Sequence, residues 1–283
     1  MSLGVLNNIS AIYAQNNLNQ TQMSLQNTLT QLSSGSRINS GADDAAGLAL
    51  ADGLHANVAA LTQSAQNASA GVGMLQTADG ALAQVTNLLN RAVTLATEAA
   101  NGTLNTSQVS SADQEYQNIL TEIGNIGSKT NYNGNAVFTA TAVNVFVSDG
   151  TASGASTFAE TVGALTTASV GTTSGGGAGA DLTASATLDS TTAAGILTTL
   201  TSAVQDVAYQ RGTIGANINQ LSAAANVANT QSVNLSSAEN NIRATNYGQA
   251  TSDMAKFKVL SQTGIAALSQ ANAVQQDVLK LLQ

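Results

Sequence analysis

The chain has 283 residues and a formal net charge of −8, and only 8% of its residues are charged, where about 25% is typical of soluble domains. Its eight basic residues form no cluster and its pI lies near 4.3, which excludes a surface that binds nucleic acid. With 43% hydrophobic residues and so few charges, a monomer would be poorly soluble, so the composition predicts assembly with other copies. The absence of cysteine and proline rules out disulfides and favours long uninterrupted helices.

The first 34 residues have the periodicity of an amphipathic helix, and Arg37 is the first charged residue of the chain. A polar face built from Asn, Gln, Ser and Thr suits packing against copies of the same chain, because unpaired buried charges would be costly. An ordinary helical bundle with a solvated polar face is the alternative. The expected apolar seam of this helix consists of Leu18, Leu25, Leu29 and Leu32.

The N-terminus has no basic region before its apolar residues, so we expect no cleaved secretion signal. No apolar run reaches the roughly 18 residues that would predict a membrane span. The chain is therefore expected either to stay in the cytoplasm or to leave by a route that reads no cleaved signal.

A glycine-rich stretch follows the first helix. Gly35, Gly41 and Gly47 predict a break, after which Asp43 and Asp44 mark the N-terminus of the next helix. The stretch has no nearby lysine and no GxxxxGK[ST] pattern, which excludes a phosphate-binding loop.

Residues 44–100 keep a heptad pattern that predicts one long helix ending at Asn101-Gly102. Asp79 places a charge within its apolar seam. His55, the only histidine, also lies in this helix. Because there is no second histidine and no HExxH motif, we expect His55 to be structural rather than catalytic or metal-binding.

A shorter helix is expected over residues 107–127, after which the pattern changes. Val143, Val145 and Val147 alternate before Asp149-Gly150, which predicts a strand and a hairpin turn. The surrounding residues 139–191 are rich in Ser, Thr, Ala and Gly. We expect a compact β-rich insert or a partly flexible loop domain, in an outermost position.

A second long helix is expected over residues 193–242, antiparallel to the helix of residues 44–100. Pairing Leu48 with Ile242 gives a register in which paired positions sum to about 290, and this register places Asp79 opposite Arg211. We expect a buried or half-buried ion pair that fixes the register; if the site is dry, removing one partner costs about 3–5 kcal/mol. In the alternative, Arg211 reaches the surface and Asp79 caps a local kink.

The C-terminal stretch, residues 250–281, repeats apolar residues at steps of three and four, which predicts a helix with one narrow seam. That seam requires a partner, and the N-terminal helix is the best candidate within the chain. Its members include Phe257, Leu260, Ala267, Ala271, Val274, Val278 and Leu281.

These elements predict a mainly α fold, in which long antiparallel helices from both ends of the chain form a coiled-coil-like bundle with a small β-rich insert at the tip. The expected domain limits are 1–42 and 243–283 for the two halves of an inner helical domain. Residues 43–138 and 192–242 would form a long-helix domain, and residues 139–191 the insert.

Several motifs resemble one known family. Residues 32–52, LSSGSRINSGADDAAGLALAD, closely resemble the N-terminal signature of bacterial flagellins. NIRATNYGQA at 241–250 and QANAVQQDVL at 270–279 are similar to the C-terminal signature, and QRGTIGAN at 210–217 to the helix before it. The resemblance covers about residues 1–138 and 192–283. Ala42 and Gln275 replace the family's frequent Lys and Pro without changing the expected helix or turn geometry.

The resemblance implies a self-assembling subunit of the extracellular flagellar filament, with no cofactor. It also implies export through the flagellar type III apparatus, an export chaperone for the C-terminal segment, and contacts with hook-associated junction and cap proteins. Arg91, Leu95 and Glu115 match positions at which a host innate immune receptor contacts flagellins, although the family's second Arg and its Glu are missing around residues 90–95.

Other classes of function fit the residues less well. A hook–filament junction protein shares the terminal helices, but the length and the continuous C-terminal match favour the filament subunit. A secreted helical adhesin is a further alternative, and membrane insertion is disfavoured because no helix has a lysine-rich amphipathic face. An enzyme is not expected, since residues 140–192 contain no His, Cys, Lys or Arg.

Overall fold

The computed structural model describes residues 8–149, 157–174, 176–183 and 187–281, with side chains up to residue 276. Contacts between Cα atoms divide the chain into two compact units, residues 1–56 with 234–283 and residues 57–233. We call them the terminal unit and the central unit and describe each by itself. The domain limits expected from sequence, at 42/43 and 242/243 among others, remain a prediction.

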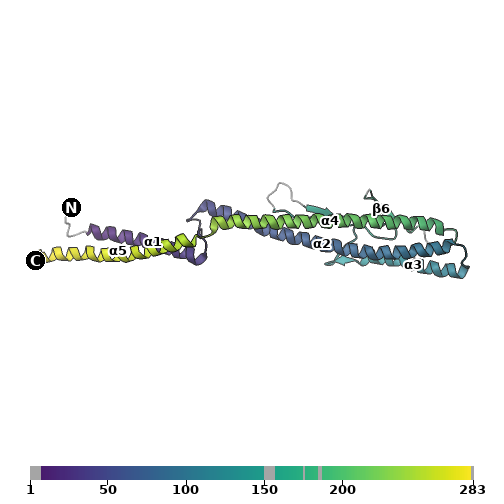
Figure 1. Ribbon diagram of the computed structural model, residues 1–283, viewed down its shortest axis with the longest axis horizontal. Helices are drawn as coiled ribbons and strands as arrows, with labels where there is room; N and C mark the ends of the chain where they lie inside the picture. Colours follow the sequence, from purple (N-terminus) through teal and green to yellow (C-terminus); the bar gives the residue numbers. More distant parts are fainter. Residues whose placement is uncertain (1–7, 150–156, 175, 184–186, 282–283) are drawn as a thin grey trace. The chain divides into compact units, whose positions relative to one another are not determined.

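Five helices and six short strands make up the described chain (Figure 1), which confirms the expected mainly α fold. The helices are α1 (Ile9–Ser34), α2 (Ala45–Ala100), α3 (Thr106–Lys129), α4 (Ala193–Arg243) and α5 (Tyr247–Leu281). The strands are β1 (Asn131–Tyr132), β2 (Asn135–Ala136), β3 (Val143–Phe146), β4 (Thr157–Glu160), β5 (Val170–Thr172) and β6 (Ala178–Ala180), paired as three antiparallel hairpins.

Short polar side chains set where the helices begin. The Asn8 carboxamide accepts a hydrogen bond from Ala11 N at the start of α1, and Asp44 Oδ1 accepts one from Gly47 N at the start of α2. Gly35 ends α1 in the left-handed conformation, with φ +70°, as helix C-termini often require. The sequence-based prediction of a break between α1 and α2 is therefore confirmed.

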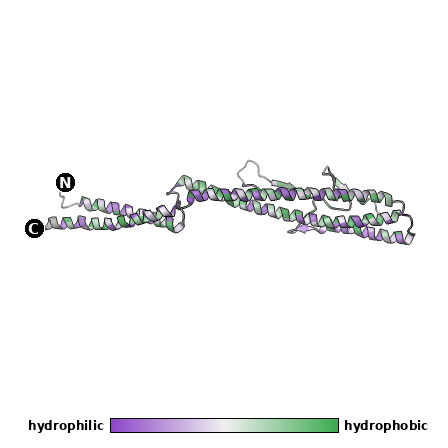
Figure 2. Ribbon diagram, in the orientation of Figure 1, coloured by the Kyte–Doolittle hydropathy of each residue, from purple (hydrophilic) through white to green (hydrophobic). Residues whose placement is uncertain are grey.

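The core of the central unit follows the heptad patterns of its helices. Figure 2 shows apolar and polar residues alternating along the long helices. Gly71 of α2 packs closely against α4, since a methyl group at this position would lie 3.0 Å from Leu221. The largest buried side chains of the central helices are Leu75, Leu82, Val85, Leu89, Tyr116, Ile123, Leu200 and Leu221.

Asp79 and Arg211 meet across α2 and α4 of the central unit. Arg211 Nε donates to Asp79 Oδ1 at 2.7 Å and Nη2 donates to Oδ2 at 3.3 Å. The two side chains are 39% and 37% exposed, so the site is not dry and the cost expected for a buried pair does not apply. At this exposure an ion pair contributes about 0–1 kcal/mol.

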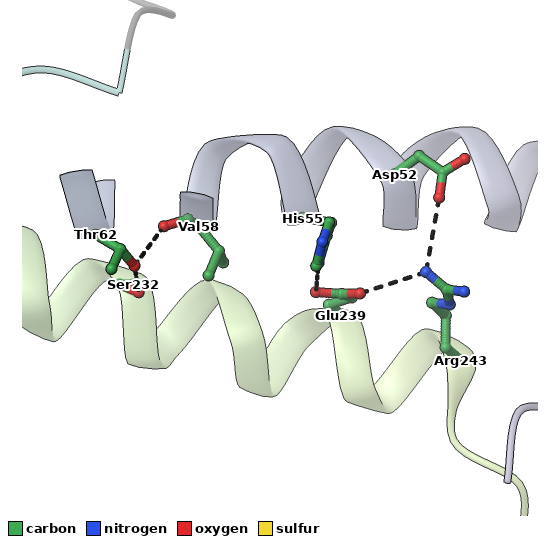
Figure 3. A network of polar contacts seen from close by, with 7 residues as sticks. All are labelled: Asp52, His55, Val58, Thr62, Ser232, Glu239 and Arg243. Atoms are coloured by element: carbon green, nitrogen blue, oxygen red, sulfur yellow. Dashed lines mark hydrogen bonds and ion pairs between the residues drawn. The ribbon is translucent and has the colours of Figure 1, made fainter. Parts of the chain in front are cut away.

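The register of α2 and α4 differs from the expected one toward the other end of the helices. In the central unit Thr62 Oγ1 lies 3.4 Å from Ser232 Oγ, and in the terminal unit Arg243 Nη1 lies 3.7 Å from Asp52 Oδ1 (Figure 3). These positions sum to 294 and 295, against 290 for Asp79 and Arg211. Toward this end of the helices the contacting positions therefore differ from the expected Leu48–Ile242 pairing by four to five residues, which is about one helical turn.

The insert packs along the flank of the central helices, whereas the sequence placed it at the tip. A methyl group at Gly171, where φ is +80°, would lie 2.5 Å from Val207 N, so glycine lets β5 lie against α4. The predicted strand at Val143 is confirmed, while Gly150 of the predicted turn lies outside the described residues. The insert adds several residues to the core of the central unit: Val145, Val162, Leu165, Val170, Leu182 and Leu188.

Glu160 is a buried acid that joins the insert to α4. It ends β4, is 2% exposed, and its Oε2 accepts a hydrogen bond of 2.6 Å from Asn217 Nδ2. Burial raises the pKa of the Glu160 carboxyl and the Asn217 hydrogen bond partly opposes this rise. Just above the unfolded pKa there is therefore a pH range in which the folded chain still binds this proton and the unfolded chain has released it.

We predict that the Asp79–Arg211 pair contributes little to stability but is measurably coupled. Asp79→Asn and Arg211→Gln, singly and combined, should show a coupling free energy of about 0.2–1 kcal/mol in urea unfolding. Asp206→Asn combined with Arg211→Gln is the matched control, because Asp206 forms no ion pair among the described residues. A coupling no larger than that of the control would remove the pair as a register determinant.

The Glu160 carboxyl should make stability depend on pH. Because its folded pKa is raised, its contribution is largest below the unfolded carboxyl pKa of about 4.3 and declines as pH rises through the folded value. Glu160→Gln should therefore match the native chain in acid and exceed its stability at neutral pH, measured by urea unfolding across pH.

Asp189 provides a control, because its contribution to stability changes with pH in the direction opposite to that of Glu160. Hydrogen bonds from Thr191 and Thr192 lower the pKa of its carboxyl to about 2, so Asp189→Asn should lose stability at neutral pH and approach the native value only in strong acid. Equal pH profiles for the native chain and Glu160→Gln would show that Glu160 is not effectively desolvated.

Candidate functional site

The two terminal helices pair antiparallel within the terminal unit, as expected. Asn8 Nδ2 donates to Ala271 O at 2.9 Å near one end, and Thr245 Oγ1 donates to Gln31 O at 3.2 Å near the other. Between these ends, a methyl group at Gly264 would lie 3.2 Å from Leu18 Cδ1. The small residue in α5 therefore allows the two helices to approach closely.

Backbone hydrogen bonds join the segment that follows α1 to the segment that precedes α5. Arg37 N donates to Arg243 O at 2.6 Å, and Thr245 N donates to Gly35 O at 3.1 Å, on either side of a single β-bridge between Ser36 and Ala244. Since each segment both donates and accepts, the bonds fix the segment after α1 against the segment before α5.

A charged cluster in the terminal unit joins α2 to α4 beside these hydrogen bonds (Figure 3). Glu239 accepts from Arg243 at 3.5 Å and lies 3.3 Å from His55 Nδ1, while Arg243 also contacts Asp52. His55 thus contacts a carboxylate of the neighbouring helix. The His55 side chain is 70% exposed, and its expected structural role stays a prediction.

Three of the four predicted seam residues of α1 face its partner. Leu18, Leu25 and Leu32 are half-buried, and Thr28, between the last two, is buried. Leu29 is 46% exposed and does not belong to the seam within the chain. Its side chain is left for another partner.

The predicted seam of α5 also divides into two sets. Phe257 and Ala271 are half-buried. Leu260, Ala267 and Val274 are exposed, with 45% of Leu260 and 49% of Val274 accessible. Val278 and Leu281 lie outside the side chains that the structure describes.

The half-buried row of α5 runs through a neighbouring stripe of the helix. This observed stripe contains polar residues, which a search for apolar periodicity passes over. The sequence-based prediction therefore chose the adjacent stripe, which is more apolar. Helical spacing alone cannot distinguish two adjacent stripes that share every second member. The observed row is Met254, Phe257, Ser261, Gly264, Leu268, Ala271 and Gln275.

The terminal helices thus keep an open apolar face after they have paired. Apolar side chains that gather on a protein surface, unlike single scattered ones, usually mark a site where another molecule binds. Charges are scarce in these helices: α1 has none, and α5 has only Asp253, Lys256, Lys258, Asp277 and Lys280. The most exposed apolar side chains are Ile9, Ile12, Tyr13, Met23 and Leu29 on α1 and Val259, Leu260, Ile265 and Val274 on α5.

The three predicted receptor contacts lie together on α2 and α3 but differ in exposure. Arg91 Nε and Nη2 donate to the two Glu115 carboxylate oxygens at 2.7 and 2.9 Å, which raises the pKa of Arg91 and lowers that of Glu115. Both side chains are about half exposed. Leu95 is 2% exposed within the core, so the folded chain offers no Leu95 side-chain surface to a receptor.

The described residues contain no group of three or more His, Cys, Asp or Glu side chains that could hold a metal ion. None of the helices in the described ranges is long and apolar enough to cross a membrane. The surface that remains to be explained is the open apolar face of α1 and α5.

Comparison with known proteins covers both ends of the chain. Residues 5–142 match the bacterial flagellin N-terminal helical region, and residues 197–282 match the bacterial flagellin C-terminal helical region. The flagellar filament 33 kDa core protein of Treponema phagedenis is 32% identical over 98% of each chain.

Other relatives match part of their length. Flagellin 1 of Proteus mirabilis is 40% identical over a region that covers 51% of this chain and 40% of its own length. Phase 1 flagellin of Salmonella naestved is 42% identical over a region that covers 45% of this chain and 25% of its own length. The crystal structure of Bacillus cereus flagellin is 30% identical, with a TM-score of 0.46 over 58% of this chain and 88% of its own. With helical regions matched at both ends and a relative aligned along nearly its whole length, the chain belongs to the bacterial flagellin family.

Proposed function

We propose that this flagellin is a structural subunit that polymerises into the extracellular flagellar filament used for motility. The observation that carries the proposal is the open apolar face of α1 and α5, which remains exposed although the two helices are already paired. A second copy of the chain is its natural partner, because each copy presents the same charge-poor surface.

The energetics favour burial of this face on assembly. Full burial of a Leu or Val side chain stabilises by about 1.5–3 kcal/mol. Leu260 and Val274 are about half exposed, so each can contribute roughly 1 kcal/mol more when a neighbouring copy covers it. Polar Asn, Gln, Ser and Thr around them lose less on desolvation than charged residues would.

The domain roles follow the same logic. In the proposed filament, residues 1–42 and 243–283 form the inner contacts between copies and residues 43–138 with 192–242 form the next layer. Residues 139–191 face outward. The packing of the insert against α4 supports a fixed rather than a loose outer layer, since Glu160 and Gln210 are buried where the insert meets that helix.

Further partners belong to the same proposal. An export chaperone would protect the C-terminal segment, which includes α5, and the chain would be exported unfolded through the type III apparatus. Junction and cap proteins would complete the two ends of the polymer. For a host receptor, Arg91 and Glu115 remain accessible as an ion pair, whereas Leu95 does not.

A hook–filament junction protein is the second candidate, and a secreted adhesin the third. The alignment with a filament core protein over 98% of both chains supports the filament subunit. Electron microscopy of the purified protein distinguishes these three candidate functions, because only a filament subunit is expected to form long polymers.

Substitutions in the open apolar face test the proposal. Leu260→Ser combined with Val274→Ser should raise the critical concentration for polymerisation roughly thirtyfold, because about 2 kcal/mol of apolar burial is lost. Sedimentation of polymer over a series of protein concentrations measures this. The monomer should unfold at nearly the same urea concentration, because both side chains lie outside the seam with α1.

Gln262→Ser combined with Gln270→Ser is the matched control, since both residues are exposed on α5 and polar. Its critical concentration should stay near that of the native chain. If both double variants polymerise alike, the face formed by Leu260 and Val274 is not a contact between copies.

A further inference from the structure

The chain contains two Asn–Gly pairs with different structural surroundings. Asn133-Gly134 forms the two-residue turn between β1 and β2, and Asn101-Gly102 follows the last residue of α2. Asparagine followed by glycine is prone to spontaneous deamidation, because glycine has no Cβ to shield its backbone nitrogen from the neighbouring carboxamide. The structure therefore decides which of the two pairs can react.

Asn133 is free to react. Its φ of +51° is unique among the non-glycine residues that the structure describes, and the residue is exposed. Its carboxamide makes no hydrogen bond with the described part of the chain. A methyl group on Gly134 would meet no atom within 4 Å, so no other segment packs against the turn at this position.

Asn101 is held in place on both sides. Its carboxamide Nδ2 donates to Thr103 Oγ1 at 3.1 Å, and its backbone N donates to Glu98 O at 3.3 Å. The hydrogen bond to Thr103 restrains the carboxamide, whose carbon would have to turn toward Gly102 N. Asn101 therefore serves as an internal reference with the same reacting residues.

We propose that Asn133 is a site of spontaneous deamidation in the folded protein and that Asn101 is protected. Gly134 N loses its proton to solvent and attacks Asn133 Cγ, the Cγ–Nδ2 bond breaks, and ammonia leaves. Water then opens the five-membered imide at either carbonyl, which yields aspartate or isoaspartate at position 133. Water is the only co-reactant.

The product changes both charge and backbone at this turn. A new carboxylate appears on the rim of a groove of about 690 Å³ that Asn133 lines together with Asn144 and Phe146. Isoaspartate also adds one methylene to the backbone, which the pairing of Tyr132 with Asn135 cannot accommodate. Because the Tyr132 hydroxyl lies 3.0 Å from where a methyl group on Gly73 would be, the change loosens a contact with α2.

Peptide mapping of the full-length chain tests this inference. The protein is aged in mildly alkaline buffer, once folded and once in denaturant, and then cleaved with trypsin. Cleavage after Arg91, Lys129 and Arg211 separates the two sites into fragments 92–129 and 130–211, and fragment-ion sequencing assigns each modified residue. In the folded chain Asn133 should react about fivefold faster than Asn101, the effect of one ordinary hydrogen bond. In denaturant the ratio should fall toward one.

Thr103→Ala provides the matched variant, because it removes the acceptor of the Asn101 carboxamide and leaves the hairpin untouched. The deamidation rate of Asn101 should rise severalfold while that of Asn133 stays constant. Equal rates for the two sites in the folded native chain would overturn the inference. So would a ratio that persists unchanged in denaturant, since the difference would then come from sequence rather than structure.

Discussion

Each terminal helix carries more apolar surface than one helical partner can cover. The pairing of α1 with α5 half-buries Leu18, Leu25 and Leu32 on one side and Met254 and Leu268 on the other. It leaves a second stripe on each helix exposed. An isolated helix of this kind is marginal in water and gains most of its stability from packing. In the proposed filament, completion of the terminal pair by other copies of the chain is therefore the condition on which assembly depends.

Charge is distributed in keeping with this condition. The central unit, residues 57–233, contains three basic and ten acidic residues and has a net charge of −7. The terminal unit contains five basic and six acidic residues and has a net charge of −1. Copies of a nearly neutral surface can pack without strong repulsion, while the negative charge of the central unit favours solubility. Within that unit, the Asp79–Arg211 pair is half exposed and is therefore expected to contribute little to stability.

The sequence predicted features that depend on local patterns. Heptad spacing and the glycines at residues 35–47 located the helices and their break, and the antiparallel pairing brought Asp79 near Arg211. Features that depend on tertiary packing were missed. The α5 seam passes through Ser261 rather than Leu260. A helix face that packs against a partner can include polar residues, whereas a prediction from apolar periodicity considers apolar residues only. Nothing in a Ser- and Thr-rich insert marks Glu160 as buried, since its burial comes from contact with α4.

Side-chain footprinting of monomer and polymer with hydroxyl radicals tests the completion of the terminal pair most directly. Tyr13 and Met23 are exposed on the open face of α1 and react readily with such radicals, whereas buried Tyr116 reports on the integrity of the central core. The account predicts that Tyr13 and Met23 become strongly protected on polymerisation while Tyr116 stays protected in both states. Equal oxidation of Tyr13 and Met23 in monomer and polymer would show that the filament is built through other surfaces.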